Sequence, residues 1–248
     1  MKISVITVCY NSESTIERAV QSVISQKDVD LEYIVIDGGS NDGTKTILES
    51  FKNDIDILVS EPDKGIYDAM NKGVEKASGD IIAILNSDDF YVSDTSLKKV
   101  IDSFTLREVQ AVYGDILYVD PRNPERIVRT WKAGKYSYAD LKDGWIPPHP
   151  AFFVKKGVYS KFGAFRTDFS IAADYEFMLR VIGKYGITMN YIEDPLVYMQ
   201  SGGHSATSLK QRIKGWKELT RAWRVNDMIP PNALWLRRIL SKLHQYFV

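Results

Sequence analysis

An apolar run ends in two adjacent carboxylates in the stretch Gly79-Asp80-Ile81-Ile82-Ala83-Ile84-Leu85-Asn86-Ser87-Asp88-Asp89-Phe90-Tyr91. Ile81 to Leu85 is short, rich in isoleucine and bounded by Gly79 and polar residues, which is typical of a strand buried on both faces of a parallel sheet. Asp88 and Asp89 follow its carboxyl end, where open α/β sheets bind ligands. The acidic pair suits a hard divalent cation, Mn²⁺ or Mg²⁺, whose other ligands come from a phosphate. The alternative is a turn capped by aspartate.

Strand-like and helix-like segments alternate on both sides of this stretch. Strands are predicted over Ile3 to Tyr10, Leu31 to Asp37 and Ile55 to Ser60, with helices between them. Ser14-Thr15-Ile16-Glu17 has the pattern of a capping box at the first helix start. A further helix is predicted from about Ile66 to Ala77, with Ile66 on its buried side. Such alternation predicts βαβ units, and therefore an α/β fold with a mostly parallel central sheet flanked by helices.

The second half is less regular. A helix is expected after Ser93, with Leu97, Val100 and Phe104 inward, and a hairpin of two strands is expected over Val112 to Val119 and Ile127 to Trp131. Tyr136 to Trp145 has no clear period, so no element is predicted there.

The glycine turn after the second strand excludes two nucleotide-binding motifs. Gly38 and Gly43 have the spacing of a P-loop, but Thr44-Lys45 reverses the required order of the lysine and the hydroxyl residue. The turn does not match Gly-x-Gly-x-x-Gly either, so neither an ATPase nor a dinucleotide-cofactor enzyme is indicated. Asp37 could accept hydrogen bonds from a uracil imide or a ribose hydroxyl, or could simply begin the turn.

Composition restricts the environment of the chain. Cys9 is the only cysteine of 248 residues, so an intrachain disulfide and a cysteine-rich zinc site are excluded. No apolar run is long enough to cross a bilayer, and the first residues do not form a signal peptide. A cytoplasmic location is the simplest expectation.

Charge is balanced overall and uneven along the chain. There are 32 basic and 32 acidic residues, so net charge does not indicate a nucleic-acid partner. From Ser205 onward the chain has a net charge of +7, and the first 204 residues have −7. This basic part reads as two helices, Leu209 to Val225 and Ala233 to Val248, separated by a Pro-Pro loop. Basic, aromatic amphipathic helices suit an anionic membrane surface, and docking on the rest of the protein is the alternative.

Four blocks together resemble a family 2 glycosyltransferase of GT-A fold, a nucleotide-diphospho-sugar transferase. They lie in the family's order and cover most of residues 3 to 90: Thr7-Val8-Cys9-Tyr10-Asn11, residues 35–44 (Val-Ile-Asp-Gly-Gly-Ser-Asn-Asp-Gly-Thr), residues 61–73 (Glu-Pro-Asp-Lys-Gly-Ile-Tyr-Asp-Ala-Met-Asn-Lys-Gly) and Leu85-Asn86-Ser87-Asp88-Asp89. The nearest likeness is to bacterial members that build capsule, O-antigen or exopolysaccharide units.

The resemblance implies roles for individual residues. Asp88 and Asp89 match the metal-binding Asp-x-Asp region, with Asn86 where many members have the first aspartate; Gly38 likewise replaces a second acidic residue of many relatives. The nucleotide site is expected to contain Thr7, Tyr10, Asn11, Asp37, Asp63, Asn71, Asn86 and Asp88. Donor or acceptor contacts are expected from Lys64, Asp68, His149, Glu176 and His204, although a structural histidine is the alternative for His149 and a surface-loop histidine for His204.

Asp174 is the expected catalytic base. It lies in Ala172-Ala173-Asp174-Tyr175-Glu176, which opens a helix. A carboxylate there is also explained by the helix dipole alone, which favours it by about 0.3–1 kcal/mol. The family pattern, in which the aspartate at this helix start acts as base, favours catalysis.

These observations predict a metal-dependent, inverting transfer of a sugar from a nucleotide donor, a UDP-sugar, to a saccharide or lipid-linked acceptor in surface polysaccharide biosynthesis. The catalytic domain is expected over residues 1–204, with a nucleotide-binding half to about 105 and an acceptor half beyond it. Residues 205–248 are expected to form a helical extension, peripheral on the inner face of the cell membrane. Two alternatives are a sugar nucleotidyltransferase, whose triphosphate loop Asn11 to Ser14 does not resemble, and an inactive nucleotide-sugar-binding partner of an assembly complex.

Overall fold

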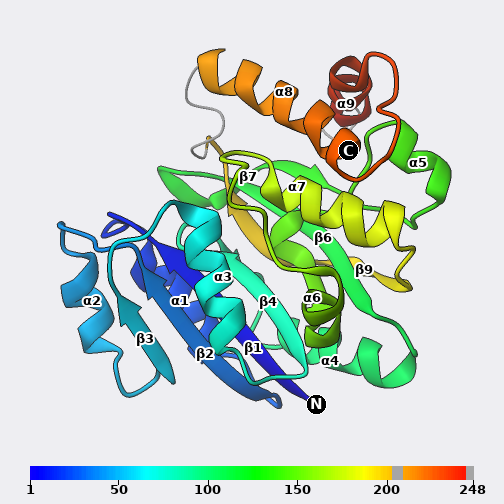
Figure 1. The fold of residues 1–248 in the computed structure, drawn as a ribbon. Helices are drawn as coiled ribbons and strands as arrows, with labels where there is room; N and C mark the ends of the chain where they lie inside the picture. Colours follow the sequence, from blue (N-terminus) through cyan, green and yellow to red (C-terminus); the bar gives the residue numbers. More distant parts are fainter. Residues whose placement is uncertain (203–208, 244–248) are drawn as a thin grey trace.

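One mixed sheet runs through the protein in a computed structural model that describes residues 1–202 and 209–243. Nine strands of the described residues form it, in the order β3-β2-β1-β4-β8-β6-β9-β5, with β7 paired to β6 (Figure 1). Their bounds are β1 Lys2–Cys9, β2 Asp30–Asp37, β3 Ile57–Ser60, β4 Ile81–Asn86, β5 Phe90–Tyr91, β6 Ala111–Asp120, β7 Asn123–Trp131, β8 Phe152–Lys155 and β9 Met189–Gln200.

Parallel pairing joins β3, β2, β1 and β4, as the alternating pattern predicts. Beyond β4, parallel pairing is confined to β6 and β9, and the other neighbouring strands are antiparallel. The carboxyl ends of β1, β2 and β4 therefore lie along one edge of the sheet, where the four sequence blocks converge.

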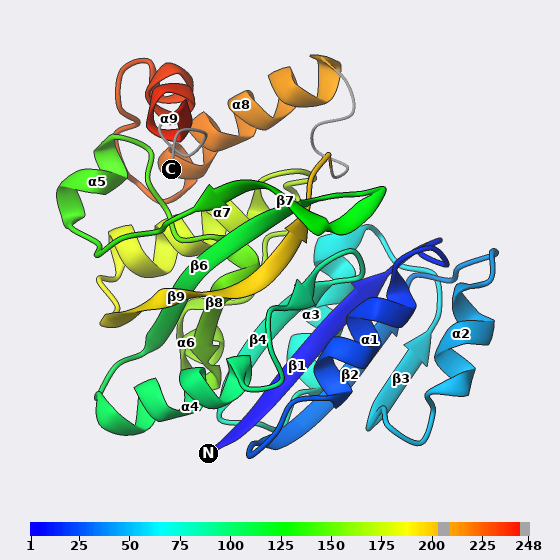
Figure 2. The same ribbon diagram turned by 180° about the vertical axis from the view of Figure 1, so that it is seen from behind.

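Strand side chains alternate between two hydrophobic cores. Ile6, Ile34 and Ile84 face the core that contains α3 (Ile66–Lys76) and α7 (Ala173–Met178). Val5 and Val35 face the opposite core, which receives α1 (Ile16–Ile24), α2 (Thr44–Ser50) and α4 (Ser96–Leu106). Figure 1 shows the first face and Figure 2 the second. Burial on both faces explains why the apolar run Ile81 to Leu85 carries no alternation.

The acceptor half contains elements that the sequence did not indicate. They are α5 (Tyr138–Lys142), the short 3₁₀ turn η1 (His149–Ala151) and α6 (Lys156–Phe162). The helix predicted to open at Asp174 is α7, which continues as the π-helical segment η2 (Leu179–Lys184). In α5 the Asp140 carboxylate accepts a hydrogen bond from the Ser137 amide, a local cap in a segment without hydrophobic period.

Two local predictions are wrong. The helix α1 begins at Ile16 without a side-chain cap, because the Ser12 carbonyl accepts the Thr15 and Ile16 amides in place of the expected Ser14–Glu17 box. Ile66 is exposed, and Tyr67 takes the buried position at the start of α3.

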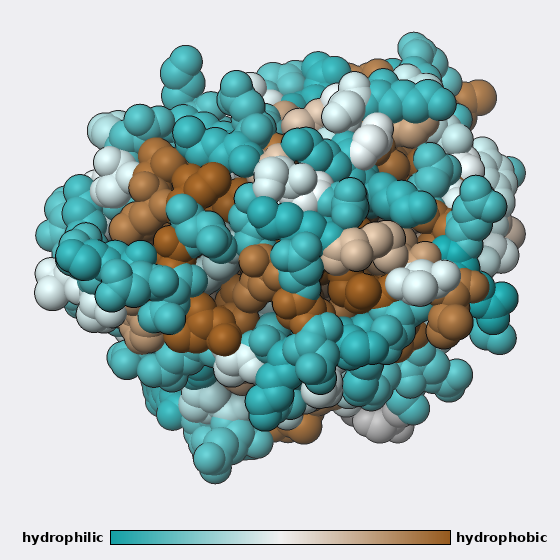
Figure 3. Space-filling model, turned by 90° about the horizontal axis from the view of Figure 1, so that it is seen from below, coloured by the Kyte–Doolittle hydropathy of each residue, from teal (hydrophilic) through white to brown (hydrophobic). Residues whose placement is uncertain are grey.

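The last two described helices, α8 (Leu209–Val225) and α9 (Leu234–Leu243), lie across the α7 side of the molecule (Figure 1). Trp223 is buried, and its Nε1 donates to the Tyr175 hydroxyl at 2.8 Å. Among the described helices there is none with the length and apolar content of a membrane span. The face on which the parallel strands begin presents apolar patches separated by hydrophilic side chains (Figure 3).

Candidate active site

The acidic pair lies directly beyond β4. Asp88 is half-buried, whereas Asp89 is buried, with its Oδ2 accepting a hydrogen bond from Asn86 Nδ2 at 3.1 Å. Asn86 Oδ1 and Asp89 Oδ1 are also buried, and neither has a hydrogen-bond partner within residues 1–202 and 209–243. Buried polar atoms are normally paired, so these two oxygens indicate a missing donor or cation.

Electrostatics at this edge favour an added positive charge. Burial raises the pKa of Asp88, and the charge of Arg18 opposes that rise. Burial, followed by repulsion from Asp88, raises the pKa of Asp89 well above its usual range. Arg18 is the nearby cation, but its guanidinium is engaged over the Phe90 ring at 4.4 Å and donates to Gln200 Oε1.

The donor set fits a hard cation only in part. The described residues contain no cluster of three His, Cys, Asp or Glu side chains able to hold a metal. Two carboxylates and one amide oxygen are nevertheless the ligand types that Mg²⁺ and Mn²⁺ take, and these ions commonly complete their shells with substrate phosphates. Asp88, Asp89 and Asn86 would therefore hold a cation jointly with a bound diphosphate.

Two residues expected in the nucleotide site are internal. Thr7 is fully buried, and its hydroxyl accepts a hydrogen bond from Tyr33. Asp37 is also fully buried, and its carboxylate accepts from Ser40 and from the Ser60 hydroxyl. Neither side chain reaches solvent in this structure, and Asp37 lies where β2 ends and the turn begins. Their contact with a nucleotide stays a prediction.

Tyr10 and Asn11 lie outside this turn. Tyr10 is 61% exposed at the end of β1. Asn11 has a positive φ of 50°, and its Oδ1 accepts from the Asn41 amide. The hydrogen bond from Asn41 to Asn11 joins the first and second sequence blocks. The exposed Tyr10 ring is available to a flat ligand.

Asp63 fills the space over Gly38. A Cβ at position 38 would clash with Asp63 Oδ2, so the Asp63 side chain would have to shift if another residue replaced Gly38. Asp63 also accepts from the Gly65 amide, and Asp68 accepts from the Lys64 amide. The Lys64 side chain is exposed beside these two carboxylates.

Asn71 has a structural role. Its Oδ1 accepts from the Phe165 amide at 2.9 Å, and its Nδ2 donates to the Phe165 carbonyl at 2.8 Å. Both polar atoms of the amide are thus engaged by one distant residue. Asn71 therefore joins the segment before α7 to α3, and its contact with a nucleotide stays a prediction.

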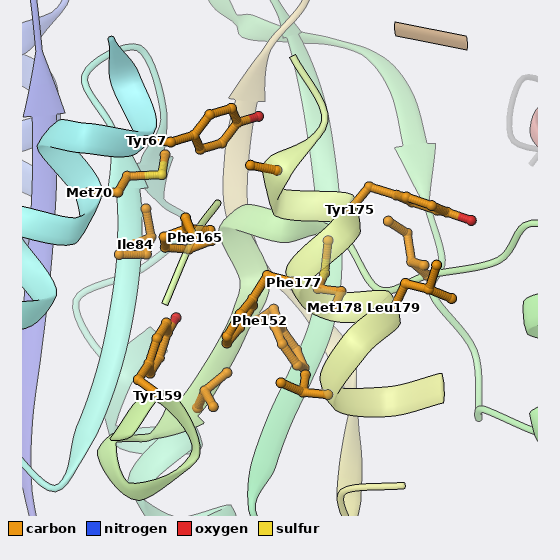
Figure 4. Packing of buried hydrophobic residues seen from close by; sticks show 14 of the residues in the cluster. Tyr67, Met70, Ile84, Phe152, Tyr159, Phe165, Tyr175, Phe177, Met178 and Leu179 are labelled. Carbon is orange, nitrogen blue, oxygen red and sulfur yellow. The ribbon is translucent and has the colours of Figure 1, made fainter. Parts of the chain in front are cut away.

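Asp174 is at the first turn of α7 and is half-buried. The Tyr67 hydroxyl donates to Asp174 Oδ1 at 3.1 Å and to the Ile171 carbonyl at 2.8 Å. Burial first, and then the Asp174 charge, raise the pKa of Tyr67 well above its usual range, so the phenol keeps its proton. Aromatic side chains, including Phe165, fill the space between α3 and α7 below this contact (Figure 4).

His149 links Asp174 to the sheet. It begins η1, which lies against β4, and its ring packs edge-on against Phe165. Burial lowers the pKa of His149, while the negative charge of Asp174 opposes the change. His149 therefore lies against the sheet that carries β4, near enough to Asp174 to be affected by its charge.

Glu176, in contrast, is turned into the protein. It is fully buried, forms a two-bond ion pair with Arg180 and accepts from Asn226 Nδ2. Both oxygens of this carboxylate accept hydrogen bonds inside the protein, so Glu176 has no exposed atom with which to contact a sugar. His204 lies outside the described residues.

Sequence reasoning missed three side chains at this site: Tyr67, Arg18 and Glu218. Tyr67 lies in the third sequence block. A hydroxyl-bearing side chain on the buried side of a helix is the pattern that could have identified it. Arg18 and Glu218 had no local signal, because they reach the site from helices distant in sequence.

The site thus separates two acidic functions. One pair of carboxylates is electrostatically suited to a cation, and a single carboxylate is held by a phenol beside a neutral imidazole. Such a division allows a proton acceptor to remain basic while another group neutralises a leaving anion.

A family model described as glycosyl transferase family 2 matches residues 4–162. Among curated proteins, the chain is 34% identical over 186 residues to an uncharacterized glycosyltransferase of Mycobacterium tuberculosis, covering 72% of this chain and 68% of that protein. It is 37% identical over 101 residues, 40% of each chain, to a putative teichuronic acid biosynthesis glycosyltransferase of Bacillus subtilis.

Solved structures share the fold at low sequence identity. Staphylococcus aureus TarS residues 1–349 in complex with UDP superpose with a TM-score of 0.71 at 18% identity, covering 98% of this chain and 71% of that one. A mannosyltransferase of Pyrobaculum calidifontis in complex with GDP-Man and Mn²⁺ gives 0.66 at 20% identity, with coverage of 98% and 69%. The GT-A fold expected from the four blocks is confirmed.

Proposed function

Because the chain belongs to glycosyl transferase family 2, we propose that it transfers a sugar from a UDP-sugar to a saccharide or lipid-linked acceptor with inversion at the anomeric carbon. The observation that carries this proposal is Asp174, a half-buried carboxylate held by Tyr67 at a helix start and separate from the acidic pair after β4.

In the proposed reaction an acceptor hydroxyl oxygen attacks the anomeric carbon of the donor. Asp174 takes the hydroxyl proton as the new carbon–oxygen bond forms, and the bond between the sugar and the diphosphate breaks with its electron pair on the departing diphosphate. Tyr67 keeps Asp174 oriented through the hydrogen bond that its hydroxyl donates to Oδ1. A divalent cation bound by Asp88, Asp89 and Asn86 would neutralise charge on the leaving diphosphate.

The choice of a UDP-sugar and a metal rests on similar proteins. TarS has been solved with UDP and with UDP-GlcNAc, and the mannosyltransferase with GDP-Man and Mn²⁺. The exposed Tyr10 ring suits stacking on a base. The similarity to the B. subtilis teichuronic acid protein supports a role in surface polysaccharide biosynthesis.

A cytoplasmic enzyme at the inner face of the membrane is the proposed setting. Trp216 and Trp235 are exposed and lie with ring centroids 5.7 Å apart, beside the exposed side chains of Arg212, Lys214 and Lys217. Aromatic and basic side chains of this kind bind the headgroup region of anionic bilayers.

The test is Asp174→Asn, with Asp102→Asn on the distant surface of α4 as its control. Asparagine keeps the size of the side chain and its bond from Tyr67 but cannot accept the proton, so we expect transfer to fall at least about a thousandfold. UDP affinity, measured by calorimetry with Mn²⁺, should equal that of the wild type in both variants.

Near-normal turnover by Asp174→Asn would remove the base from the mechanism. UDP binding by a wild type that never transfers sugar would instead favour the inactive-partner function. Chelation of the metal should weaken UDP binding in the wild type, and unchanged binding would contradict a cation at Asp88 and Asp89.

A further inference from the structure

Glu218 of α8 reaches the segment that carries the catalytic helix. It is 7% exposed, and its Oε2 accepts the Ile171 and Ala172 amides, each at 2.9 Å. The Ser170 hydroxyl donates to Oε1 at 3.0 Å, and the Ser170 amide points at both oxygens at 3.2 and 3.3 Å. Three successive backbone amides therefore converge on one carboxylate from a residue 46 to 48 positions later in the chain.

This arrangement ends two residues before Asp174. Ala172 is the N-cap residue of α7 and makes no side-chain cap bond of its own. The Ile171 peptide is held on both sides, because its amide donates to Glu218 and its carbonyl accepts the Tyr67 hydroxyl that also reaches Asp174. A displacement of this peptide would move the α7 start and the phenol that orients Asp174 together.

Arg221 of α8 binds the carbonyl and the carboxylate of Asp168, earlier in this segment, and two contacts at the C-terminal end of α8 hold α7 itself. Asn226 donates to Glu176, and Trp223 donates to Tyr175. Glu218 differs from them because it alone of the three binds the backbone immediately before Asp174.

We propose that Glu218 is a positioning residue for Asp174, so that the C-terminal helix α8 completes the catalytic site. This inference rests on the proposed function, since it gives Asp174 the role of base. A carboxylate is required because it offers only acceptors to the three amides, whereas the amide group of a glutamine would point a donor at one of them.

The experiment compares Glu218→Gln with Asn226→Ala in the full chain. Glu218→Gln disturbs buried hydrogen bonds from α8 to residues 170–172, and Asn226→Ala removes one from the residue after α8 to Glu176 of α7, so only the first loosens the segment before Asp174. We expect kcat per UDP-binding site to fall about ten- to a hundredfold in Glu218→Gln with donor KM unchanged, since small misplacements of catalytic groups cost this much. Asn226→Ala should keep kcat per site within about threefold of the wild type.

A second measurement does not depend on turnover. Amide hydrogen exchange of a peptide spanning residues 171–174 should accelerate at least about tenfold in Glu218→Gln and remain unchanged in Asn226→Ala. Glu218→Asp, which keeps the charge but is shorter by one methylene, should recover part of both effects.

Wild-type kcat per site together with wild-type exchange in Glu218→Gln would overturn the positioning role. An equal loss of kcat per site in Glu218→Gln and Asn226→Ala would also overturn it, because general loosening of α8 would then explain both. If the wild type transfers no sugar, the proposed function fails, while the exchange measurement still decides whether Glu218 holds this segment.

Discussion

At the scale of single residues, Tyr67 is the closest observed partner of the proposed base. Its one hydroxyl proton is shared between the Ile171 carbonyl at 2.8 Å and Asp174 Oδ1 at 3.1 Å, so the longer bond orients Asp174 while withdrawing little of its charge. Orientation should therefore outweigh any gain in basicity when the hydroxyl is removed. Tyr67→Phe should lower kcat about tenfold at unchanged donor KM, as measured by initial rates over a range of UDP-sugar concentrations.

The control for Tyr67→Phe is Tyr159→Phe, a buried ring in the same aromatic cluster that stacks on Phe177. Wild-type kcat in Tyr67→Phe would show that the bond to Asp174 does not serve catalysis. An equal loss in Tyr159→Phe would attribute the effect to the cluster rather than to the hydroxyl.

Individual residues also show where prediction from sequence ends. The position of Asp174 at a helix start was predictable because a capping pattern and a family pattern coincide there, and its role as base stays a prediction. The internal engagement of Asn71 and Glu176 was not, because their partners Phe165 and Asn226 lie 94 and 50 residues away. A polar residue in a sequence block that resembles the family gives the same local pattern whether its side chain faces a ligand or the protein interior.

At the scale of elements, the strands of the first half were predictable because a short apolar run between two polar turns is typical of a strand buried on both faces. α5 was not, since it is only five residues long. The helix from Asp174 onward was expected, but not the π-helical form of its second part, η2. Long-range contacts, rather than local propensity, decide such elements.

Glu32 illustrates how the first strands are held together. On β2, it accepts hydrogen bonds from Ser4 of β1, from Ser78 before β4 and from Lys2. Burial opposes ionisation, but these bonds outweigh it and lower the pKa of Glu32 to about 2. Since the folded pKa lies below the unfolded value, the stabilisation is complete above about pH 4.5 and is lost as pH falls toward 2.

Glu32→Gln should therefore lower the free energy of unfolding by about 3 kcal/mol at pH 7, the equivalent of the pKa shift. The difference from the wild type should shrink between pH 4.5 and 2, as measured by urea denaturation at several pH values. Glu49→Gln, in a surface pair with Lys52, is the control and should change stability by less than about 0.5 kcal/mol. A loss that is independent of pH in this range would contradict the ionic origin.

At the scale of the whole molecule, the C-terminal helices have two different sides. Arg237 binds Asp143, and Arg238 donates to the Gly144 carbonyl, so these two basic residues dock α9 on the α5 segment. From the sequence, the basic residues of both helices are expected on a membrane-facing surface. Among the described residues of these two helices, the exposed large apolar side chains are Ile213, Trp216, Trp235 and Leu236, which we call the aromatic surface.

The aromatic surface gives a sharper test of membrane binding than deletion of the helices, since deletion would also remove Glu218 from the catalytic segment. Trp216→Gln combined with Trp235→Gln should reduce binding to vesicles that contain anionic lipid at least about tenfold, because two indole rings lose their place in the headgroup region. Sedimentation with anionic and with zwitterionic vesicles would measure it. Leu106→Gln, at an exposed apolar residue of α4, is the matched control and should bind like the wild type. Unchanged binding by the double variant would place any membrane contact elsewhere. The wild type, the double variant and the control should transfer sugar to a soluble acceptor at the same rate, because neither tryptophan contacts Asp174 or its partners.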